Sequence, residues 1–582
     1  MSSHLIFDLA EAKRAVSTFD NAEGRPAPEF KIALLRNYSA EFIQPFLRFY
    51  FNRAGLRCNL QLGGFNTVEQ DVLSGEAIAD ARLIVLSLTL DELEPDWQFG
   101  RFSPAEIANR ITGVVELING KSPAPVLINT VLRPVLADEG AAQAASEGSI
   151  ARRIAEVNDH LARYAATNHK CLLVDWERLV MLLGAEKALD RRLQYLASAP
   201  FKHPFLSAYA YEIFRVARLL TGAGKKCVIL DCDNTLWGGV VGEAGIAGIA
   251  LDRNTYPGRA YYDFQKNIVR LSERGIMVAL CSKNNLEDVT AVLEQHPHCL
   301  LRPAHLVAMR VNWEDKERNI AAIVEDLNIA MDAVVFIDDN PVECARIASF
   351  LPDLTVVQVP EQLSDLPLLL EREGLFDQLS VTQEDLARTQ LYREEGRRKQ
   401  TAARFATAEE FLASLDMVAR IKRASTEEVP RVAQLTQKTN QFNLTTRRYS
   451  EGQIADMIGS QDWAVFTLSP RDSFGDLGLS GVLIVHRRED GYWIDSMLMS
   501  CRILGRELER QFVTTCVERL DVDWGPGIWH AEYLPTKKNS QVEAFWPAFG
   551  FTEEMKSDAG VRYAVARADL SLPDFSFIRV EE

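Results

Sequence analysis

The stretch Lys226–Gly239, KCVILDCDNTLWGG, decides the fold of the central part of the chain. It opens with the apolar run Cys227–Leu230, typical of a strand buried on both faces of a parallel sheet, and continues into Asp231 and Asp233. Ligands of such a sheet bind beyond the carboxyl ends of its strands, so an acidic pair there faces a cleft. Neighbouring carboxylates repel unless a cation or proton lies between them, and oxygen ligands suit Mg²⁺. Taken alone, the pair is equally compatible with a turn.

Three later stretches place polar residues where a strand meets a loop or a loop meets a helix. These residues are Ser282 after IMVALC (Ile276–Cys281), Lys316 in WEDKERNI, and Asp338 with Asp339 after AVVFI (Ala333–Ile337). The chain therefore carries an acid pair, a hydroxyl, a lysine and a second acid pair in that order, with helical segments between them. The ordered set indicates a site more strongly than any one of its members.

The four stretches resemble the signature motifs of the haloacid dehalogenase (HAD) phosphotransferase superfamily. LDCDNTLWGG, CSKNN, NWEDKERN and VFIDDNP are more specifically similar to the FkbH-like branch, whose members are associated with loading glyceryl units onto acyl carrier proteins. The resemblance is clearest over roughly Gly222–Pro360. It implies a HAD-like Rossmannoid parallel sheet in the centre of an α/β multidomain protein, and an enzyme of the phosphotransferase type.

The resemblance also implies roles for the acidic residues. Asp231 is expected to be the nucleophile toward phosphorus and a ligand of Mg²⁺. Asp233 is expected to protonate the leaving oxygen and to reach the metal through its backbone carbonyl. Asp338, with Asp339 close by, is expected to hold the ion from the opposite side.

The remaining site residues are expected to bind the substrate and its charge. Ser282 hydrogen-bonds a phosphoryl oxygen in this scheme, and Lys316 offsets the charge that accumulates in the transition state. We also assign Thr235 and Asn284, which belong to the first two motifs, to substrate binding. The intervals between the motifs leave no room for a sizeable cap domain, because each βα unit already needs roughly 30 residues. We therefore expect an open site that is accessible to a macromolecule.

Cys232, between the two acids, is the residue that distinguishes a transferase from a phosphatase. An enzyme thioester there divides the transfer of an acyl group from an acyl phosphate to a carrier thiol into two easier steps. The neighbouring carboxylates should raise the pKa of the thiol, and on an ideal strand its side chain points to the opposite face from Asp231. We predict an acyl carrier at Cys232, with a small buried core residue as the alternative.

The segment before the central domain alternates strands and helices. IALL, LIVLSL, VLIN and CLLV are predicted strands, separated by predicted helices at Ala40–Ala54, Pro104–Asn119 and Ile150–Tyr164. The pattern predicts a doubly wound, flavodoxin-like sheet with a solvated loop at Leu136–Ser149, and it resembles the SGNH-hydrolase-like module. Ser39 lies where such a hydrolase carries its nucleophile, but the Gly-Asp lead-in and the Asp-x-x-His partner are missing, so we expect a turn or N-cap residue in a docking domain.

The last part of the chain is predicted to be α+β. WAVFTL, LSGVLIVHR and YWIDSMLM are expected strands, and VPRVAQLTQ and GRELERQFVTTCVERL are expected helices. SCRILGRELE resembles the pyrophosphate-binding turn of the GNAT N-acetyltransferase fold, with Arg502 and Gly505 matching and Glu507 in place of the last glycine. A carboxylate there competes with an anionic cofactor, so we expect no acetyl-CoA binding. We assign Arg447 and Arg448 to binding a phosphopantetheine phosphate or an acidic carrier surface.

Composition limits the partners and the cellular compartment that can be expected for the chain. The 582 residues suggest about three domains, and the net charge of −17 argues against non-specific binding to nucleic acid or anionic membranes. The nine cysteines are scattered without a CxxC pair, which indicates reduced thiols, and no signal peptide or membrane span is evident, so we expect a cytoplasmic protein. The expected parts are an arm (1–30), the SGNH-like domain (31–192), a helical bridge (193–221), the HAD-like domain (222–362), a helical connector (363–404) and the GNAT-like domain (405–582).

Three functions remain open on the sequence alone. The first is an Mg²⁺-dependent transferase that takes a three-carbon unit from a phosphorylated small-molecule donor, such as 1,3-bisphosphoglycerate, and loads it onto an acyl carrier protein thiol. The second is a phosphatase that uses the same carboxylates. The third is a non-catalytic scaffold that binds carrier proteins, against which the intact acid pairs argue.

Overall fold

The computed structural model describes residues 6, 8–20, 28–135, 140, 146–222, 224–379, 381–386, 388–402, 405, 407–536, 538–557 and 559–581. The chain forms two compact units, one of Met1–Leu220 with Tyr449–Ile454 and the other of Thr221–Arg448 with Ala455–Glu582. Residues 136–139 and 141–145 of the predicted solvated loop lie outside the described residues.

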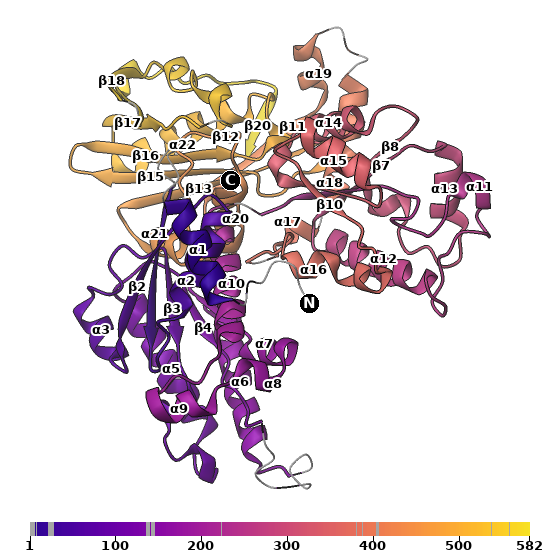
Figure 1. The fold of residues 1–582 in the computed structure, drawn as a ribbon. Helices are drawn as coiled ribbons and strands as arrows, with labels where there is room; N and C mark the ends of the chain where they lie inside the picture. The colour runs from indigo at the N-terminus through magenta and orange to yellow at the C-terminus, as the bar shows by residue number, and fades with distance from the viewer. Residues whose placement is uncertain are drawn as a thin grey trace. The chain divides into compact units, whose positions relative to one another are not determined.

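The first unit contains a five-stranded parallel sheet with strand order β2-β1-β3-β4-β5 (Figure 1). Its strands are β1 (Glu29–Arg36), β2 (Arg57–Phe65), β3 (Leu83–Ser87), β4 (Val126–Asn129) and β5 (Cys171–Val174). The helices of this unit include α1 (Leu9–Asp20), α2 (Ile43–Arg53), α3 (Val68–Ser74), α5 (Pro104–Asn119), α6 (Ile150–Thr167), α7 (Trp176–Leu183), α9 (Arg191–Ala197) and α10 (His203–Leu220). Alternate strand residues such as Ala33 and Ile84 pack with α5 and α6, while Phe30 packs against α2. The predicted doubly wound sheet is confirmed, with the flavodoxin-like strand order.

Two details of this unit go beyond the sequence prediction. β2 was not among the predicted strands, because it lies at the edge of the sheet and exposes every second or third residue, which weakens its apolar signal. Ser39 lies in the turn between β1 and α2, and its hydroxyl donates a hydrogen bond to the carbonyl oxygen of Ala197 at 2.6 Å. A turn residue was the expected role of Ser39.

The second unit contains another five-stranded parallel sheet, with order β10-β9-β6-β7-β8. Its strands are β6 (Cys227–Leu230), β7 (Met277–Ser282), β8 (Leu306–Val311), β9 (Val334–Asp338) and β10 (Thr355–Gln358). Its helices include α12 (Gly258–Glu273), α13 (Leu286–Gln295), α14 (Lys316–Asp326) and α15 (Pro341–Phe350). The central strand β6 is buried on both faces, as its apolar run predicts.

The two faces of β6 belong to different cores. Cys227 and Ile229 pack with residues of α14 and α15, whereas Val228 and Leu230 pack with residues of α12 and α13. This alternation is the ordinary period of a strand. It assigns the residues that follow the strand to opposite sides of the sheet.

The same unit also carries a ten-stranded mixed sheet. Eight of its strands follow the order β18-β19-β17-β16-β15-β13-β11-β20, while β12 pairs with β16 and β14 pairs with β13. The strands are β11 (Met417–Arg423), β12 (Phe442–Asn443), β13 (Trp463–Asp472), β14 (Gly475–Asp476), β15 (Gly481–Arg488), β16 (Gly491–Met499), β17 (Ile528–Tyr533), β18 (Thr552–Ser557), β19 (Gly560–Ala566) and β20 (Ile578–Glu581). Its helices include α20 (Val429–Lys438), α21 (Glu451–Gly459) and α22 (Leu508–Trp524). This confirms the predicted α+β character.

The connector between the two sheets of the second unit is helical, as expected. It comprises α16 (Leu369–Glu373), α17 (Gln383–Leu386), α18 (Arg388–Ala402) and α19 (Ala408–Ser414). It is not a loose linker, because Gly275, just before β7, approaches the backbone of Asp385 so closely that a Cβ at that glycine would overlap the Asp385 carbonyl oxygen. The connector therefore packs directly on the start of the parallel sheet.

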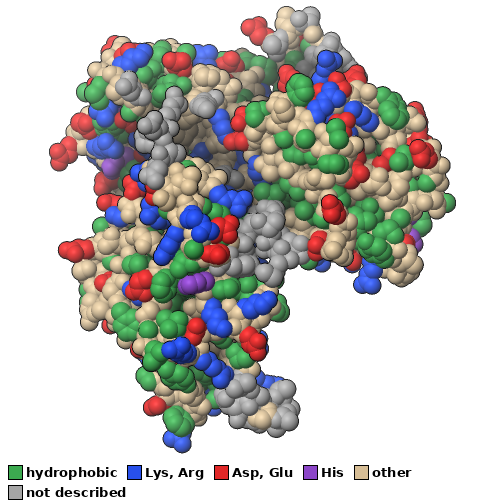
Figure 2. Space-filling model, viewed as in Figure 1, with side chains coloured by type: hydrophobic (Ala, Val, Ile, Leu, Met, Phe, Trp, Pro, Cys, Tyr) green, Lys and Arg blue, Asp and Glu red, His purple; other side chains and the backbone are tan. Residues whose placement is uncertain are grey.

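Acidic and basic side chains are interspersed over the surface. On the face in Figure 2, Lys and Arg side chains (blue) lie among Asp and Glu side chains (red). Within the described part of the chain, no helix combines the length and the apolar character that crossing a bilayer requires.

Candidate functional site

The site is built at the carboxyl ends of β6, β7 and β9. Leu230 lies opposite Leu280 of β7 and Ile337 of β9, so Asp231 emerges at the level of the last residues of both neighbours. The backbone N–H of Asp231 donates to the carbonyl oxygen of Ile337 at 3.0 Å, which continues the ladder by one step. The predicted convergence of the first and last motifs at one edge of the sheet is therefore what the register produces.

Lys316 joins the two acidic motifs. Its Nζ lies 2.9 Å from Oδ1 of Asp231 and 2.6 Å from Oδ2 of Asp338. All three side chains are buried, with Asp231 only 5% exposed. Lys316 is the first residue of α14, and Ile320 and Ile323 on the same helix anchor it in the core beneath the sheet. The lysine is thus held by packing in the position that bridges the two carboxylates.

Burial and charge shift the pKa values of this cluster in opposite directions. Burial first, and then the Asp338 carboxylate, raise the pKa of Asp231 to about 6, against the opposing effects of Lys316 and the Ser282 hydroxyl. Burial alone would lower the pKa of Lys316, but the Asp231 and Asp338 carboxylates raise it above its ordinary value. The ammonium therefore stays charged at neutral pH.

Asp233 is fixed by three donors. Its Oδ1 accepts from Nε1 of Trp237 at 2.8 Å and from the backbone N–H of Val241 at 3.1 Å. Its Oδ2 accepts from Nδ2 of Asn284 at 2.9 Å. These bonds hold the carboxylate in place beside Asp231, and they bring Asn284, on the loop after β7, into contact with Asp233.

Ser282 and Thr235 present hydroxyls in the same buried region. Ser282 is the last residue of β7, and its hydroxyl is one of the groups that lower the pKa of Asp231. The Thr235 side chain is fully buried, and among the described residues its hydroxyl has no hydrogen-bond partner. A buried hydroxyl without a partner is costly in a folded protein, so Thr235 is available to a group that enters the site.

Asp231, Asp338 and Asp339 form the metal-binding candidate. Each offers one carboxylate oxygen, and these oxygens lie within 4.8 Å of one another. Burial and the adjacent Asp338 also raise the pKa of Asp339. An all-oxygen set of carboxylates, without Cys or His, fits a hard divalent cation such as Mg²⁺.

Cys232 points away from this cluster. It belongs to the apolar core formed with Val228 and Leu230, and its side chain has no exposed area. Burial first, and then the Asp231 carboxylate, raise the pKa of its thiol well above the ordinary value. These are the properties of a core residue, and the role of acyl carrier stays a prediction that experiment must decide.

Arg447 and Arg448 make their contacts within the mixed sheet and the loops beside it. Arg447 pairs with Asp495 at 3.0 Å and with Glu532 at 2.6 Å. Arg448 donates to the carbonyl oxygen of Thr439 at 2.9 Å, among other backbone and amide acceptors. Both guanidiniums thus have structural partners, and their assignment to substrate binding remains untested.

The turn before α22 carries the substitution noted in the sequence. Glu507 is the N-cap of α22 and adopts a left-handed conformation, with φ 62°. Its Oε2 lies 3.5 Å from Nη1 of Arg510. The helix accordingly begins at Leu508, later than the predicted start at Gly505, because this left-handed residue interrupts the turn. A carboxylate at the N-terminus of this helix is expected to disfavour binding of an anionic cofactor.

A short strand fills the gap between two strands of the mixed sheet. β16 and β17 pair only from Tyr492–Ile494. Beyond that point β12 pairs with β16, Leu444 donates to the carbonyl oxygen of Met497 at 3.2 Å, and Leu534 donates to that of Leu444 at 2.8 Å. The chain's own backbone therefore satisfies the strand edges where these two strands separate.

Lys283 follows Ser282 directly and received no role from the sequence. Lys283 forms an ion pair with Glu343 of α15 at 2.9 Å. Lys283 lies in the quoted motif CSKNN, directly after Ser282, so its position was a usable signal.

Comparison with known proteins identifies a structural relative of the first part of the chain. No protein-family model matches the sequence, and no curated protein matches it. The N-terminal part of BF1531 from Bacteroides fragilis, a structure described as containing a phosphatase domain complexed with Mg, has a TM-score of 0.58 and 23% identity, covering 64% of this chain and 100% of that chain. This likeness shows a shared fold.

Acetyltransferase structures match a smaller part of the chain. The ribosomal-protein-S18-alanine N-acetyltransferase from Escherichia coli has a TM-score of 0.21 and 14% identity, over 26% of this chain and 94% of that chain. The acetyltransferase from Salmonella typhimurium that modifies the N-terminal serine of the 50S ribosomal protein L7/L12 has a TM-score of 0.21 and 15% identity, over 25% and 93%.

Proposed function

We propose that the central site performs Mg²⁺-dependent phosphoryl chemistry in an enzyme that loads a three-carbon acyl unit from a phosphorylated donor onto an acyl carrier protein thiol. The observation that carries the phosphoryl part is Lys316 held between Asp231 and Asp338, with Asp339 completing a set of carboxylate oxygens. The structural relative described as containing a phosphatase domain complexed with Mg supports it. The three-carbon donor and the carrier protein rest on the resemblance of the motifs to the FkbH-like branch.

The phosphoryl step uses side chains at the carboxyl ends of the parallel strands. A carboxylate oxygen of Asp231 bonds to the phosphorus of the donor's phosphomonoester while the bond from that phosphorus to the ester oxygen breaks, and Asp233 gives its proton to that oxygen, so the donor's acyl phosphate stays intact. Water then cleaves the aspartyl phosphate, so inorganic phosphate leaves and Asp233 regains a proton. Lys316 and Ser282 hold phosphoryl oxygens during both steps.

Asp231, the backbone carbonyl of Asp233 and Asp338 would hold Mg²⁺, with Asp339 close by. When bound, the ion supplies positive charge that reduces the repulsion between the Asp231 carboxylate and an incoming phosphate. Such charge, together with Lys316, offsets the mutual repulsion of the buried Asp231 and Asp338 carboxylates and the half-buried Asp339 carboxylate.

The acyl step needs an acceptor that reaches the same edge of the sheet. The sulfur of a carrier thiol bonds to the carbonyl carbon of an acyl phosphate, the bond to the phosphate oxygen breaks, and phosphate leaves with the thiol proton. Because the thiol of Cys232 is buried in the core, we propose direct transfer to the carrier thiol, without an enzyme thioester.

Exposed apolar side chains near the site support a macromolecular acceptor. Six large apolar side chains are exposed between β6 and β10 in the described residues. Five of them follow the carboxyl ends of β6, β7, β8 or β9, and these are Val240, Tyr256, Leu286, Trp313 and Val342. Trp313 is 71% and Val342 73% exposed. Apolar side chains concentrated at one edge are typical of a surface that another protein covers.

A simple phosphatase is the second candidate, favoured by the phosphatase domain named for the structural relative. Intact mass measurement separates the candidates. The protein is incubated with Mg²⁺, 1,3-bisphosphoglycerate and candidate carrier proteins. A glyceryl unit added to the carrier supports the transferase, phosphate release with an unchanged carrier supports the phosphatase, and neither product contradicts both.

A further inference from the structure

A basic cavity lies in the second unit, at the start of the parallel sheet. It has a volume of about 70 Å³ and is bounded by residues that precede or begin β6 and β7, by α18 and α20, and by the end of β16. Five of the described residues lining it are basic and none is acidic; they are Lys226, Arg388, Arg431, Lys438 and Arg502. This concentration of positive charge stands out in a chain whose net charge is −17.

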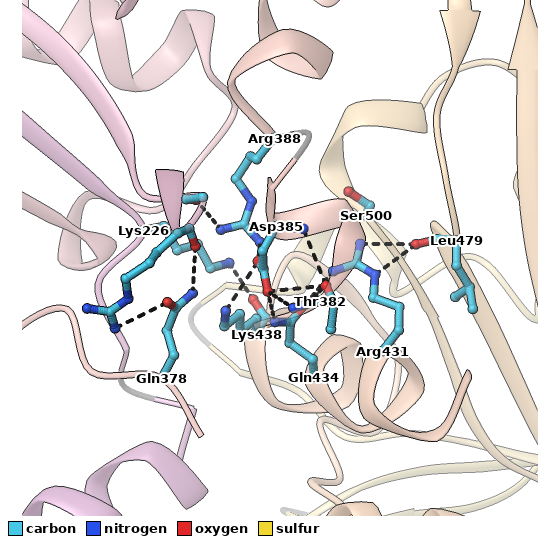
Figure 3. Close-up of polar contacts among 12 residues, drawn as sticks. Lys226, Gln378, Thr382, Asp385, Arg388, Arg431, Gln434, Lys438, Leu479 and Ser500 are labelled. Carbon is cyan, nitrogen blue, oxygen red and sulfur yellow. Dashed lines mark hydrogen bonds and ion pairs between the residues drawn. The ribbon is translucent and has the colours of Figure 1, made fainter. Parts of the chain in front are cut away.

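Hydrogen bonds hold two of the guanidinium groups that line the cavity, those of Arg388 and Arg431 (Figure 3). Arg388 donates to the carbonyl oxygen of Gly275 at 2.6 Å and pairs with Asp385. Arg431 donates from Nε and Nη2 to the carbonyl oxygen of Leu479, at 3.1 and 3.0 Å. Because backbone carbonyls hold both groups, they cannot turn toward bulk solvent without losing these bonds. The positive charge is therefore built into the fold.

Lys438 is the group that lacks an acceptor. Its side chain is 22% exposed, and among the described residues its ammonium contacts only Asp385, at 3.6 Å, which is too long for a hydrogen bond. An ammonium carries three donors, and those of Lys438 remain available to solvent or to a bound anion. Burial first, and then Arg388, lower the pKa of Lys438 to about 7 against the opposing effect of Asp385, and Arg431 and Lys226 lower it further.

We propose that this cavity binds one tetrahedral oxyanion, with the ammonium of Lys438 as its principal donor. At roughly 10–15 Å³ for each enclosed water, the cavity has the capacity of several waters, which is the size of a sulfate or phosphate ion. The anion is a free inorganic ion or the phosphoryl end of a small phosphomonoester. It supplies the acceptors that Lys438 lacks and offsets the surrounding guanidinium charge.

This site is separate from the one at Asp231. Lys226 directly precedes β6 and Met277 begins β7, whereas Asp231 and Ser282 lie at the other ends of these strands. The inference therefore does not depend on the proposed transferase activity. It also predicts that binding persists in a chelator, where phosphoryl binding at the carboxylate site is expected to fail.

Sulfate binding to the full-length protein tests the proposal by calorimetry, in a chelator at constant ionic strength. Sulfate keeps its charge across the pH range used. We expect one saturable site in the wild type and in Asp231→Asn, and affinity lower by about tenfold or more in Lys438→Met, because a charged hydrogen bond is lost. Lys438→Arg, which keeps the charge, is the matched control and should retain binding. No saturable binding in the wild type, or equal affinity in Lys438→Met, would overturn the proposal.

The pH dependence of the wild type provides a test that needs no variant. An anion favours protonated Lys438, so sulfate affinity should fall as the pH rises through about 7 and binding should take up protons; the other charged groups that act on Lys438 are Arg388, Arg431, Lys226 and Asp385. Lys438→Arg should lose this dependence. A sulfate affinity that is constant from pH 6 to 9 would contradict the role of Lys438.

A third titration distinguishes the sources of the anion. Glycerol 2-phosphate binding more tightly than sulfate, with the same loss in Lys438→Met, would assign the site to a phosphomonoester. Weaker binding than sulfate, with the same dependence on Lys438, would assign it to a free inorganic ion. Binding of the ester that is unchanged in Lys438→Met would count against the site.

Discussion

Lys316 Nζ lies 2.6 Å from Oδ2 of Asp338, and both side chains are almost completely buried. A buried ion pair stabilises a protein only when its geometry is good and its remaining hydrogen bonds are satisfied. Here the lysine also contacts Asp231, and the other oxygen of Asp338 accepts from the backbone N–H of Asn340 at 2.8 Å. The arrangement holds one cation among acids that would otherwise repel each other, and its consequences can be measured.

Asp231→Asn should abolish phosphate release while leaving the fold intact. The change removes the nucleophile and a metal ligand at almost constant shape, so we expect a loss on the order of 10⁴-fold or more. Chelation of Mg²⁺ should have the same effect. Phosphate release is measured together with thermal unfolding. Asp288→Asn, a change at a half-buried carboxylate in the first turn of α13, is the control. Release at an undiminished rate in Asp231→Asn would remove that residue from the mechanism.

Lys316→Met should make the protein depend on Mg²⁺ for stability. Without the ammonium, Asp231 and Asp338 face each other unpaired, and loss of one partner of a buried ion cluster costs about 3–5 kcal/mol of unfolding free energy. Bound Mg²⁺ should restore part of it. Thermal unfolding in chelator and in saturating Mg²⁺ should show a larger increase in Tm for the variant than for the wild type.

Lys283→Met is the control for that comparison. Lys283 pairs with Glu343 in the first turn of α15, but its side chain is partly exposed, so a small effect is expected. An equal Mg²⁺-dependent rise in Tm for wild type and Lys316→Met would show that the ion does not bind beside Lys316.

Cys232→Ala should retain both phosphate release and loading of a carrier protein. The thiol packs with Val228 and Leu230, so the change should cost only about 1 kcal/mol of stability through lost packing. Intact mass of the carrier and phosphate release are measured in parallel. Loss of loading alone would show that an enzyme thioester forms at Cys232, the role suggested by its position between the two acids.

The mixed-sheet domain should bind no acetyl-CoA in calorimetry. Glu507 places a carboxylate at the N-terminus of α22, and Phe442–Leu444 fills the gap where β16 and β17 separate. Glu507→Gly should raise the unfolding free energy by about 1 kcal/mol, because the left-handed conformation is unfavourable for a residue with a side chain. Micromolar affinity of the wild type for acetyl-CoA would contradict the first expectation, and a destabilised Glu507→Gly the second.

The strand ends were predictable because local sequence determines them. Apolar runs that stop at Asp231, Ser282 and Asp338 give both the strands and the edge at which these residues meet. The opposite orientation of Cys232 also follows from the period of a strand. Burial of its thiol depends on the packing of α12 and α13 over that face, and the motif alone does not predict this packing.

The basic cavity was not predictable from sequence. The sequence around Lys438 predicts no anion site, and Arg388 lies in the connector (363–404), which is predicted only to be helical. Their meeting requires Asp385 to reach Gly275, a contact over more than a hundred positions in the chain. Such contacts are set by the tertiary packing of helices whose individual sequences indicate only that they are helical.

The lengths of β6 and β7 determine how far apart the two proposed sites of the second unit lie. From Lys226 to Asp231, and from Met277 to Ser282, the chain advances five residues, or about 17 Å at roughly 3.3 Å per residue. No three-carbon phosphate ester spans that distance. Two anions bound at the ends of these strands would therefore be two separate molecules, and any influence of one on the other would have to travel along rigid, fully buried backbone rather than through a shared ligand.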